Sequence, residues 1–366
     1  PEICSLDCFD TWSLSGIYRP VILIRKPQSF IQDLFVRADY NPKDQSGRLR
    51  VQMALDSFPP SHTRTETVTG EIRLTGPQGT ELLRKQKTVQ VSGQAIPSPH
   101  LEWDESIPNV QPWSAESPVL ATLTVSLQFD KRLGEQVIRQ VGFRSVHIQG
   151  GVFMLNGVPI KLKGVCRDEL DPSAGAAFNQ TLWRRDLQLM KAANINAVRT
   201  LFHPPDERFI DLCDEMGMYV IEEVPFDFAE HLLWDTRYLP YFLLRGRGVV
   251  TRDRSHPSVL SWSIGNENPY TGMTREIISL VKAIDPSRPV LCPQRDEENL
   301  PSEVDILAPH FPAGDDLAKL CQPPEGSTPR PVIMTAFSHA LGNGCGGLQN
   351  IWEKVRECEK CGGGMI

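Results

Sequence analysis

The sequence has 366 residues, of which 40% are hydrophobic and 23% charged, a composition typical of a globular protein. One core rarely organises this length, so about two or three domains are expected. The formal net charge of −7, with scattered Lys and Arg, gives no reason to expect a nucleic-acid partner, and no run of about 18 apolar residues indicates a membrane span.

The N-terminal segment, residues 1–26, is too short to fold alone and is expected to belong to a preceding domain. The chain opens at Pro1 without a methionine and stops at Ile366 after an apolar stretch, so both ends look cut. The absence of a signal peptide therefore leaves the localisation open.

Residues 27–147 show the two-residue period of half-buried β-strands. Apolar and polar residues alternate over residues 49–55 and 123–129, helical patterns are absent, and turns such as Gly76-Pro77 separate the runs. We therefore expect an immunoglobulin-like antiparallel β-sandwich. Trp103 and Trp113 are expected in its core rather than as a sugar-binding platform.

Residues 148–366 alternate short apolar runs with amphipathic helices. Helical spacing appears over residues 209–216, 277–284 and 348–355. Eight strand candidates lie in the same region: Ile160–Val165, Ala197–Thr200, Tyr219–Glu222, Val259–Ile264, Val290–Leu291, Ile306–Ala308, Val332–Thr335 and Gly364–Ile366. This pattern predicts a (β/α)₈ TIM barrel that lacks its last helix, with a doubly wound open sheet as the alternative. No Gly-x-Gly-x-x-Gly follows any strand, so dinucleotide binding has no support.

Polar residues gather where the predicted strands end, and in a barrel these ends form the active-site face. The fourth strand runs straight into Gly265-Asn266-Glu267. Taken alone, Asn266 and Glu267 are ordinary loop residues. Five other strand ends also carry such groups, which favours a site: Arg167, Asp168 and Glu169; Arg199 and His203; Glu222 and Glu223; His310; and His339.

The nine cysteines show no disulfide-framework spacing. Cys166, Cys213 and Cys292 lie in or beside apolar segments, and Cys358-x-x-Cys361 has no second pair or nearby histidines to make a metal site. Thiol usage leans towards a reducing, cytoplasmic compartment.

Several stretches in chain order resemble glycoside hydrolase family 2, the β-galactosidase and β-glucuronidase group. Residues 12–19 (WSLSGIYR) resemble the end of its sugar-binding jelly roll, which makes residues 1–26 a remnant of that domain. Residues 141–144 with 155–157, and 196–200 with 209–220, resemble its sandwich–barrel junction and early barrel strands. Residues 253–257, running into 265–267, resemble its acid/base motif, and residues 338–343 the segment after its nucleophile.

The resemblance implies a retaining exo-β-glycosidase, which needs two carboxyl groups ~5 Å apart. Glu267 carries over as the acid/base and Asn266 as a partner of the sugar 2-hydroxyl. The expected substrate-binding set is Asn266, Arg199, His339, Phe202 and His310, and the partner is a β-linked oligosaccharide or glycoside. No cofactor is required, and Asp227 with Ala229 only half matches the magnesium ligands of the β-galactosidase branch, so neither Mg nor Na is supported.

The nucleophile position of the resemblance is Ala336, and no Asp or Glu occurs between Gly326 and Trp352. A methyl group cannot attack an anomeric carbon, so hydrolysis is expected to be very slow. A nucleophile removed by design and natural drift both fit. Three other departures from the family favour natural drift. Phe202 stands in place of a subsite His, and Cys166 and Asp168 stand in place of Asn and His.

Three functions stay open at this point. The first is a feeble β-glycosidase, the second a carbohydrate-binding pseudoenzyme with Trp262 and Phe202 as candidate pocket walls, and the third a scaffold. The sugar recognised, a homo-oligomeric state and metal dependence are not fixed by the sequence.

Overall fold

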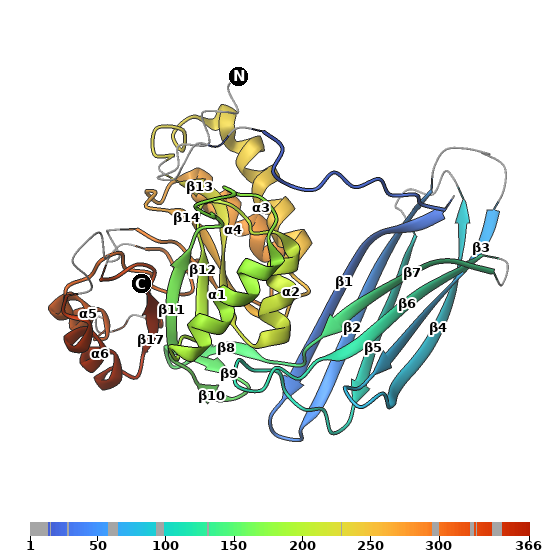
Figure 1. Ribbon diagram of the computed structural model, residues 1–366, viewed down its shortest axis with the longest axis horizontal. Coiled ribbons are helices and arrows are strands. Elements are labelled where there is room, and N and C mark those ends of the chain that lie inside the picture. Colours follow the sequence, from blue (N-terminus) through green and yellow to red (C-terminus); the bar gives the residue numbers. More distant parts are fainter. Residues whose placement is uncertain are drawn as a thin grey trace. The chain divides into compact units, whose positions relative to one another are not determined.

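The structure is a computed structural model, and it describes residues 14, 16–27, 29–57, 65–92, 99–129, 132–227, 229–294, 300–322, 326, 328–338 and 346–366. The chain forms two compact units (Figure 1). One contains residues 1–20, 146–254 and 258–366, and the other contains residues 21–145 and 255–257.

The second unit is an antiparallel β-sandwich of seven strands, as the two-residue period predicts. One sheet has the order β1–β2–β5, and the other has the order β4–β3–β6–β7. The strands are β1 (Ser29–Asn41), β2 (Ser46–Ser57), β3 (Thr65–Thr75), β4 (Glu81–Ser92), β5 (His100–Ile107), β6 (Ala121–Phe129) and β7 (Arg132–Val141). Trp103 and Trp113 are buried in this unit, which confirms that neither is a surface platform.

The first unit begins with a small antiparallel sheet of β8 (Val146–Gln149), β9 (Val152–Leu155) and β10 (Val158–Pro159). A seven-stranded parallel sheet follows, in the order β15–β14–β13–β12–β11–β17–β16. These strands are β11 (Leu162–Arg167), β12 (Ala197–Thr200), β13 (Tyr219–Asp227), β14 (Val259–Asn266), β15 (Val290–Leu291), β16 (Val332–Met334) and β17 (Cys361–Met365).

Residues 306–310, which are sixth in chain order, lie between β15 and β16 and close the seven-stranded sheet into an eight-membered barrel. Isolated parallel bridges join Leu291 to Ile306 on one side and Leu307 to Val332 on the other. The order of the predicted strands is therefore confirmed, and the open doubly wound sheet is wrong. A register that continues from strand to strand brings the carboxyl ends of all eight to one face.

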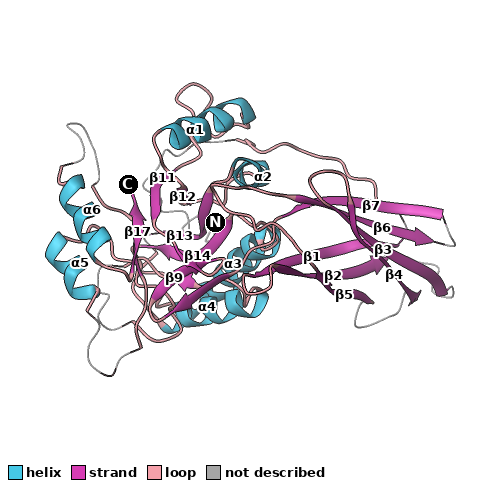
Figure 2. Ribbon diagram, turned by 90° about the horizontal axis from the view of Figure 1, so that it is seen from below, coloured by secondary structure: helices cyan, strands magenta, loops and turns pink. Residues whose placement is uncertain are grey.

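Helices surround the parallel sheet (Figure 2). They are α1 (Gln180–Ala192), α2 (Glu207–Met216), α3 (Leu239–Asp253), α4 (Gly272–Ile284), α5 (Gly314–Leu320) and α6 (Leu348–Glu357), with a short 3₁₀ helix, η2 (Thr236–Tyr238). The three spacings that predict helices correspond to α2, α4 and α6. None of the helices in the described part of the chain has the length and apolar character that a membrane crossing requires.

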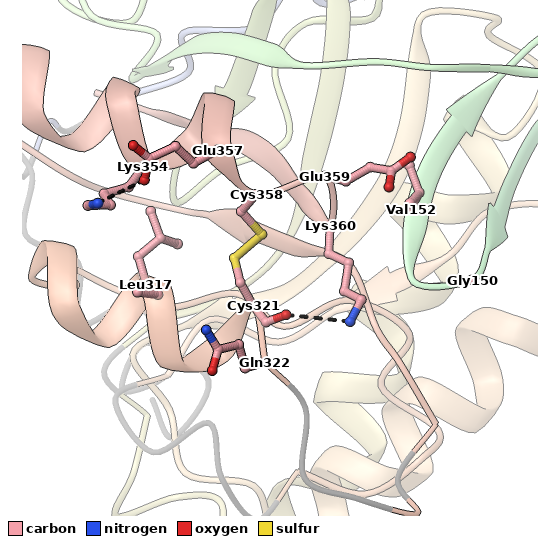
Figure 3. A pocket seen from close by; sticks show the side chains of 11 residues that line it. Gly150, Val152, Leu317, Cys321, Gln322, Lys354, Glu357, Cys358, Glu359 and Lys360 are labelled. Atoms are coloured by element: carbon pink, nitrogen blue, oxygen red, sulfur yellow. Dashed lines mark hydrogen bonds and ion pairs between the residues drawn. A yellow bond between two sulfur atoms is a disulfide. The ribbon is translucent and has the colours of Figure 1, made fainter.

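A disulfide between Cys321 and Cys358 joins the C-terminal ends of α5 and α6 (Figure 3). The cysteine spacing gave no indication of this bridge, because its partners are 37 residues apart in the sequence. Among the described cysteines, Cys166, Cys213, Cys292 and Cys361 are free thiols.

Candidate active site

A buried arginine organises the barrel end where β12, β13 and β14 finish. Arg199, with 1% of its side chain exposed, forms an ion pair through Nη2 with Glu223 Oε2. The same Nη2 donates to Asn266 Oδ1 at 2.9 Å, and Nη1 donates to the carbonyl oxygen of Thr335 at 3.3 Å. Arg199 therefore fixes the orientation of Asn266, the residue directly before Glu267.

Glu223 compensates this buried charge. Its Oε1 accepts a hydrogen bond from the backbone N–H of Phe202 at 2.9 Å, and its own N–H donates to Thr200 Oγ1 at 3.1 Å. Burial raises the pKa of Glu223, and the Arg199 guanidinium acts against that rise. Glu223 thus holds both Arg199 and the turn at Phe202.

A second buried carboxyl, Asp227, lies at the end of β13. Burial raises the pKa of Asp227 well above its ordinary value, and the neighbouring Glu223 carboxylate raises it further. Asp227 therefore keeps its proton to a higher pH than an ordinary Asp does. At Ala229 the side chain is a buried methyl group, and its N–H donates to Asn268 Oδ1 at 2.8 Å. Because Ala229 offers a methyl group and no ligand atom, these two residues supply only one carboxyl, which is a poor donor set for a divalent cation.

Glu267 directly follows β14 and faces His310, from the segment 306–310 that closes the barrel. Its Oε1 lies 3.4 Å from His310 Nε2, and the two side chains are 15% and 4% exposed. On its other side, His310 Nδ1 lies 3.1 Å from Thr335 Oγ1, whose hydroxyl donates to the carbonyl oxygen of Ala308 at 3.2 Å. Two elements that are distant in sequence thereby bring a carboxyl group and an imidazole ring together.

Ala336 lies next to this pair. A parallel bridge joins it to His310, and its carbonyl oxygen accepts a hydrogen bond from the N–H of Phe311 at 2.8 Å. The side chain at the end of β16 is therefore a methyl group. His339, the other residue expected from this segment, lies outside the described residues.

Left-handed backbone is concentrated at this face of the barrel. Phe202, Glu267, Phe311 and Ser338 have φ of 64°, 51°, 50° and 50°, and each follows the end of a barrel strand or bridge. Non-glycine residues seldom adopt positive φ, and such conformations cluster where side chains are held for function. Phe202 is buried here, beside the Glu223 carboxylate.

Glu222 belongs to a different environment from that expected. Neighbouring residues of a strand point to opposite faces, and Glu222 points towards α3, where it lies 3.5 Å from Arg252 Nη2. Burial raises the pKa of Glu222 well above its ordinary value, and the adjacent Asp253 adds to that rise. The expectation that Glu222 lies on the active-site face is therefore wrong.

The other expected polar residues make contacts of their own. Glu169 pairs with Arg19 at 2.6 Å, and Arg167 pairs with Asp186 at 3.3 Å. Trp262 is fully buried and donates through Nε1 to Asp285 Oδ2 at 2.9 Å, so it is a core residue and not a pocket wall.

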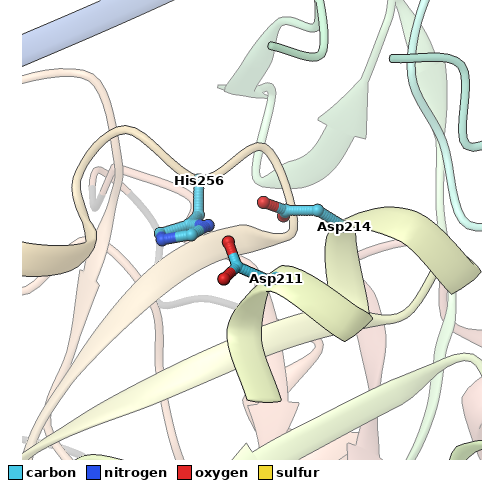
Figure 4. Close-up of side chains that lie close together, drawn as sticks. All are labelled: Asp211, Asp214 and His256. Carbon is cyan, nitrogen blue, oxygen red and sulfur yellow. The ribbon is translucent and has the colours of Figure 1, made fainter. Parts of the chain in front are cut away.

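Helix α2 carries two further carboxylates, Asp211 and Asp214, on one side (Figure 4). Asp214 accepts a hydrogen bond from the N–H of Ser258 at 2.9 Å. This contact ties α2 to the start of β14, at the opposite end of that strand from Glu267.

The sequence matches profiles of one protein family over both units. Residues 29–144 match "Glycosyl hydrolases family 2", and residues 146–366 match "Glycosyl hydrolases family 2, TIM barrel domain". A β-galactosidase of Vibrio cholerae is 33% identical over 386 aligned residues, which cover 98% of this chain and 36% of that protein. A β-galactosidase of Photobacterium profundum is 30% identical with the same coverage. The chain thus spans about a third of the length of these relatives.

Solved structures share the fold. A glycosyl hydrolase family 2 member from Bacteroides cellulosilyticus superposes with a TM-score of 0.79 at 22% identity, covering 93% of this chain and 46% of that one. A family 2 β-galacturonidase from Eisenbergiella tayi, bound to galacturonate, also gives 0.79 at 22% identity, covering 93% of this chain and 65% of that one.

Proposed function

This chain belongs to glycosyl hydrolase family 2, and from that premise we propose that its barrel carries the site of a retaining exo-β-glycosidase with Glu267 as acid/base and no nucleophile. The observation that supports this most directly is the position of Ala336 beside His310, which in turn faces Glu267. Hydrolysis by the unmodified chain is then very slow, because no covalent glycosyl intermediate forms at a methyl group.

Each residue has a distinct part in the proposed chemistry. Glu267 protonates the glycosidic oxygen and later deprotonates the attacking water. Asn266, held by Arg199, accepts or donates to the sugar 2-hydroxyl, and Phe202 and His310 border the sugar. We assign His339 a binding role on sequence grounds alone. The chemistry needs no cofactor.

The proposed substrate is a β-linked glycoside of galactose type. The two curated relatives are named β-galactosidases, and the galacturonate-bound enzyme acts on a galactose-derived acid. Residues 338–343 also resemble the β-galactosidase branch. β-Glycosides of other monosaccharides are tested beside it as alternative substrates.

The experiment compares the unmodified chain with its Ala336→Glu variant on nitrophenyl β-glycosides of several sugars. We expect turnover in the variant, strongest on β-galactoside, and almost none in the unmodified chain. The matched control is Ala336→Glu combined with Glu267→Gln, which should lose turnover of 4-nitrophenyl substrates. A folded Ala336→Glu variant that cleaves no β-glycoside would contradict the proposal.

A second function, sugar binding without turnover, is favoured by one specific observation. The Arg199–Glu223–Asn266 network is complete even though Ala336 removes the nucleophile. Calorimetric titration of the unmodified chain with galactose and galactosides should then give saturable binding, and Asn266→Ala should weaken it. Flat isotherms over a panel of mono- and disaccharides would exclude this function.

A further inference from the structure

The Cys321–Cys358 disulfide lines a cavity whose lining includes none of the candidate active-site residues. The cavity has a volume of about 450 Å³ and lies between the ends of α5 and α6, with Gly150 and Val152 on another side. Figure 3 shows the sulfur–sulfur bond at its centre. Both cysteines are half-buried, so the bridge is in contact with a space large enough for a small molecule.

Lysine and glutamate side chains both lie around this bridge. Lys360 Nζ lies 3.4 Å from the carbonyl oxygen of Cys321. Lys354 lines the cavity one turn before Cys358 and forms an ion pair with Glu357 at 2.8 Å, and Glu359 also lines the cavity. Lys161 Nζ donates to the carbonyl oxygen of Cys358 at 2.8 Å. Cationic groups stabilise thiolates, both the one that attacks a disulfide and the one that leaves.

Cys361, the nearest free thiol along the chain, does not compete for the bridge. It is fully buried in β17, and burial raises its thiol pKa. A buried, protonated thiol is a poor nucleophile. Exchange at the bridge therefore depends on a thiol supplied from solution.

We propose that this disulfide is a thiol-exchange site for small monothiols that enter through the cavity. A thiolate attacks Cys321 Sγ and forms a mixed disulfide, while the electron pair of the broken bond goes to Cys358 Sγ, which takes a proton from water. A second thiolate attacks the external sulfur of the mixed disulfide and releases Cys321 as a thiol. Two small thiols are oxidised to one small disulfide, and one protein disulfide is reduced to two thiols.

Lys161 determines the direction of attack that we assign. Its ammonium group donates to the carbonyl oxygen of Cys358, so Cys358 is the leaving group with a cation beside it.

The test exposes the folded protein to reduced glutathione, quenches with acid, alkylates free thiols and maps peptides by mass spectrometry. We expect a transient glutathione adduct on Cys321, followed by alkylation of Cys321 and Cys358, while Cys213 and Cys292 stay unmodified until denaturant is added. A bridge that survives until the protein unfolds would overturn the proposal. An adduct found only on Cys358 would overturn the assigned direction.

Three variants separate the cavity from general loosening. Ala318→Leu narrows the cavity and should slow exchange by about tenfold or more, because access limits the reaction. Lys319→Leu, on the same helix but outside the cavity, should exchange at the unmodified rate. Cys361→Ser should also leave the rate unchanged. Equal rates for Ala318→Leu and the unmodified chain, or a slower rate for Cys361→Ser, would contradict the proposal.

Discussion

Glu267 Oε1 and His310 Nε2 lie 3.4 Å apart. The hydrogen bond made by the other ring nitrogen of His310, Nδ1, bears on which tautomer of the ring faces Glu267. Thr335 donates its hydroxyl hydrogen to the carbonyl oxygen of Ala308, so His310 Nδ1 must be the donor to Thr335 Oγ1. A single proton between Glu267 and Nε2 then satisfies both groups. In the proposed mechanism, His310 is the fixed partner of the acid/base residue Glu267.

The first prediction concerns His310 in the Ala336→Glu background. Replacing it, as His310→Ala, should slow cleavage of 4-nitrophenyl glycosides by roughly tenfold or more, because the proton partner of Glu267 is lost. Cleavage of 2,4-dinitrophenyl glycosides, whose leaving group needs no protonation, should change little. Equal losses on both substrates would indicate a binding or folding defect instead.

The second prediction concerns the buried pair Arg199–Glu223. Glu223→Ala leaves the Arg199 guanidinium without its direct partner, and it should lower the free energy of unfolding by about 3 kcal/mol. The matched control is Asp104→Ala, which removes the exposed partner of Arg48 and should change urea denaturation little. Similar midpoints for both variants would mean that the buried network contributes little.

The third prediction concerns pH. Burial acts to raise the pKa of Asp285, but Arg288 and hydrogen bonds from Ser287 and Trp262 outweigh it and lower the pKa to about 2. The folded state therefore favours the carboxylate, and this stabilisation is present above pH ~4 and lost as the pH falls towards about 2.

Asp285→Asn should accordingly lower the free energy of unfolding at neutral pH by about 2 kcal/mol. The difference from the unmodified chain should shrink below pH ~4. Urea denaturation at several pH values measures this, with the exposed Asp316→Asn as a control. A difference that stays constant down to pH 2 would show that the Asp285 carboxylate is not the cause.

The fourth prediction compares two glycines. Gly363 in β17 has a φ of +105°, and a Cβ there would lie 2.1 Å from the carbonyl oxygen of Leu162. Gly363→Ala should destabilise the barrel by about 3 kcal/mol or more. Gly248, exposed in α3, has open space around its Cβ position, and Gly248→Ala should stabilise by about 0.5–1 kcal/mol. The thermal unfolding temperatures of both variants test this. An unchanged unfolding temperature for Gly363→Ala would contradict the prediction.

The barrel was predictable because its strands are short, apolar and separated by amphipathic helices. Helices α2 and α4 each bury one face, so their apolar residues recur at helical spacing, and this spacing is visible in a single sequence. Helix α3 was not anticipated, because Pro240, Gly246 and Gly248 obscure its pattern. Residues 306–308 were predicted as the sixth strand in chain order, although they are held by isolated bridges and do not form a regular strand.

The site was predictable only in part. Position along the chain indicated Glu267, Asn266, Arg199 and His310, but it could not show that Glu222 points to α3 while Glu223 points to Arg199. That distinction depends on which face of β13 each residue occupies, and two adjacent glutamates give no pattern from which the face can be predicted. The role of Thr335 in orienting His310 was also missed, because the two residues lie 25 positions apart in the sequence.

The most direct test of the central claim adds azide to the unmodified chain with a 2,4-dinitrophenyl β-glycoside. If Ala336 leaves open the position of the nucleophile, azide should occupy it and attack the anomeric carbon from the face opposite the leaving group. We predict azide-dependent release of dinitrophenol and an α-configured glycosyl azide by proton NMR. A rate independent of azide, or a β-configured product, would contradict the claim.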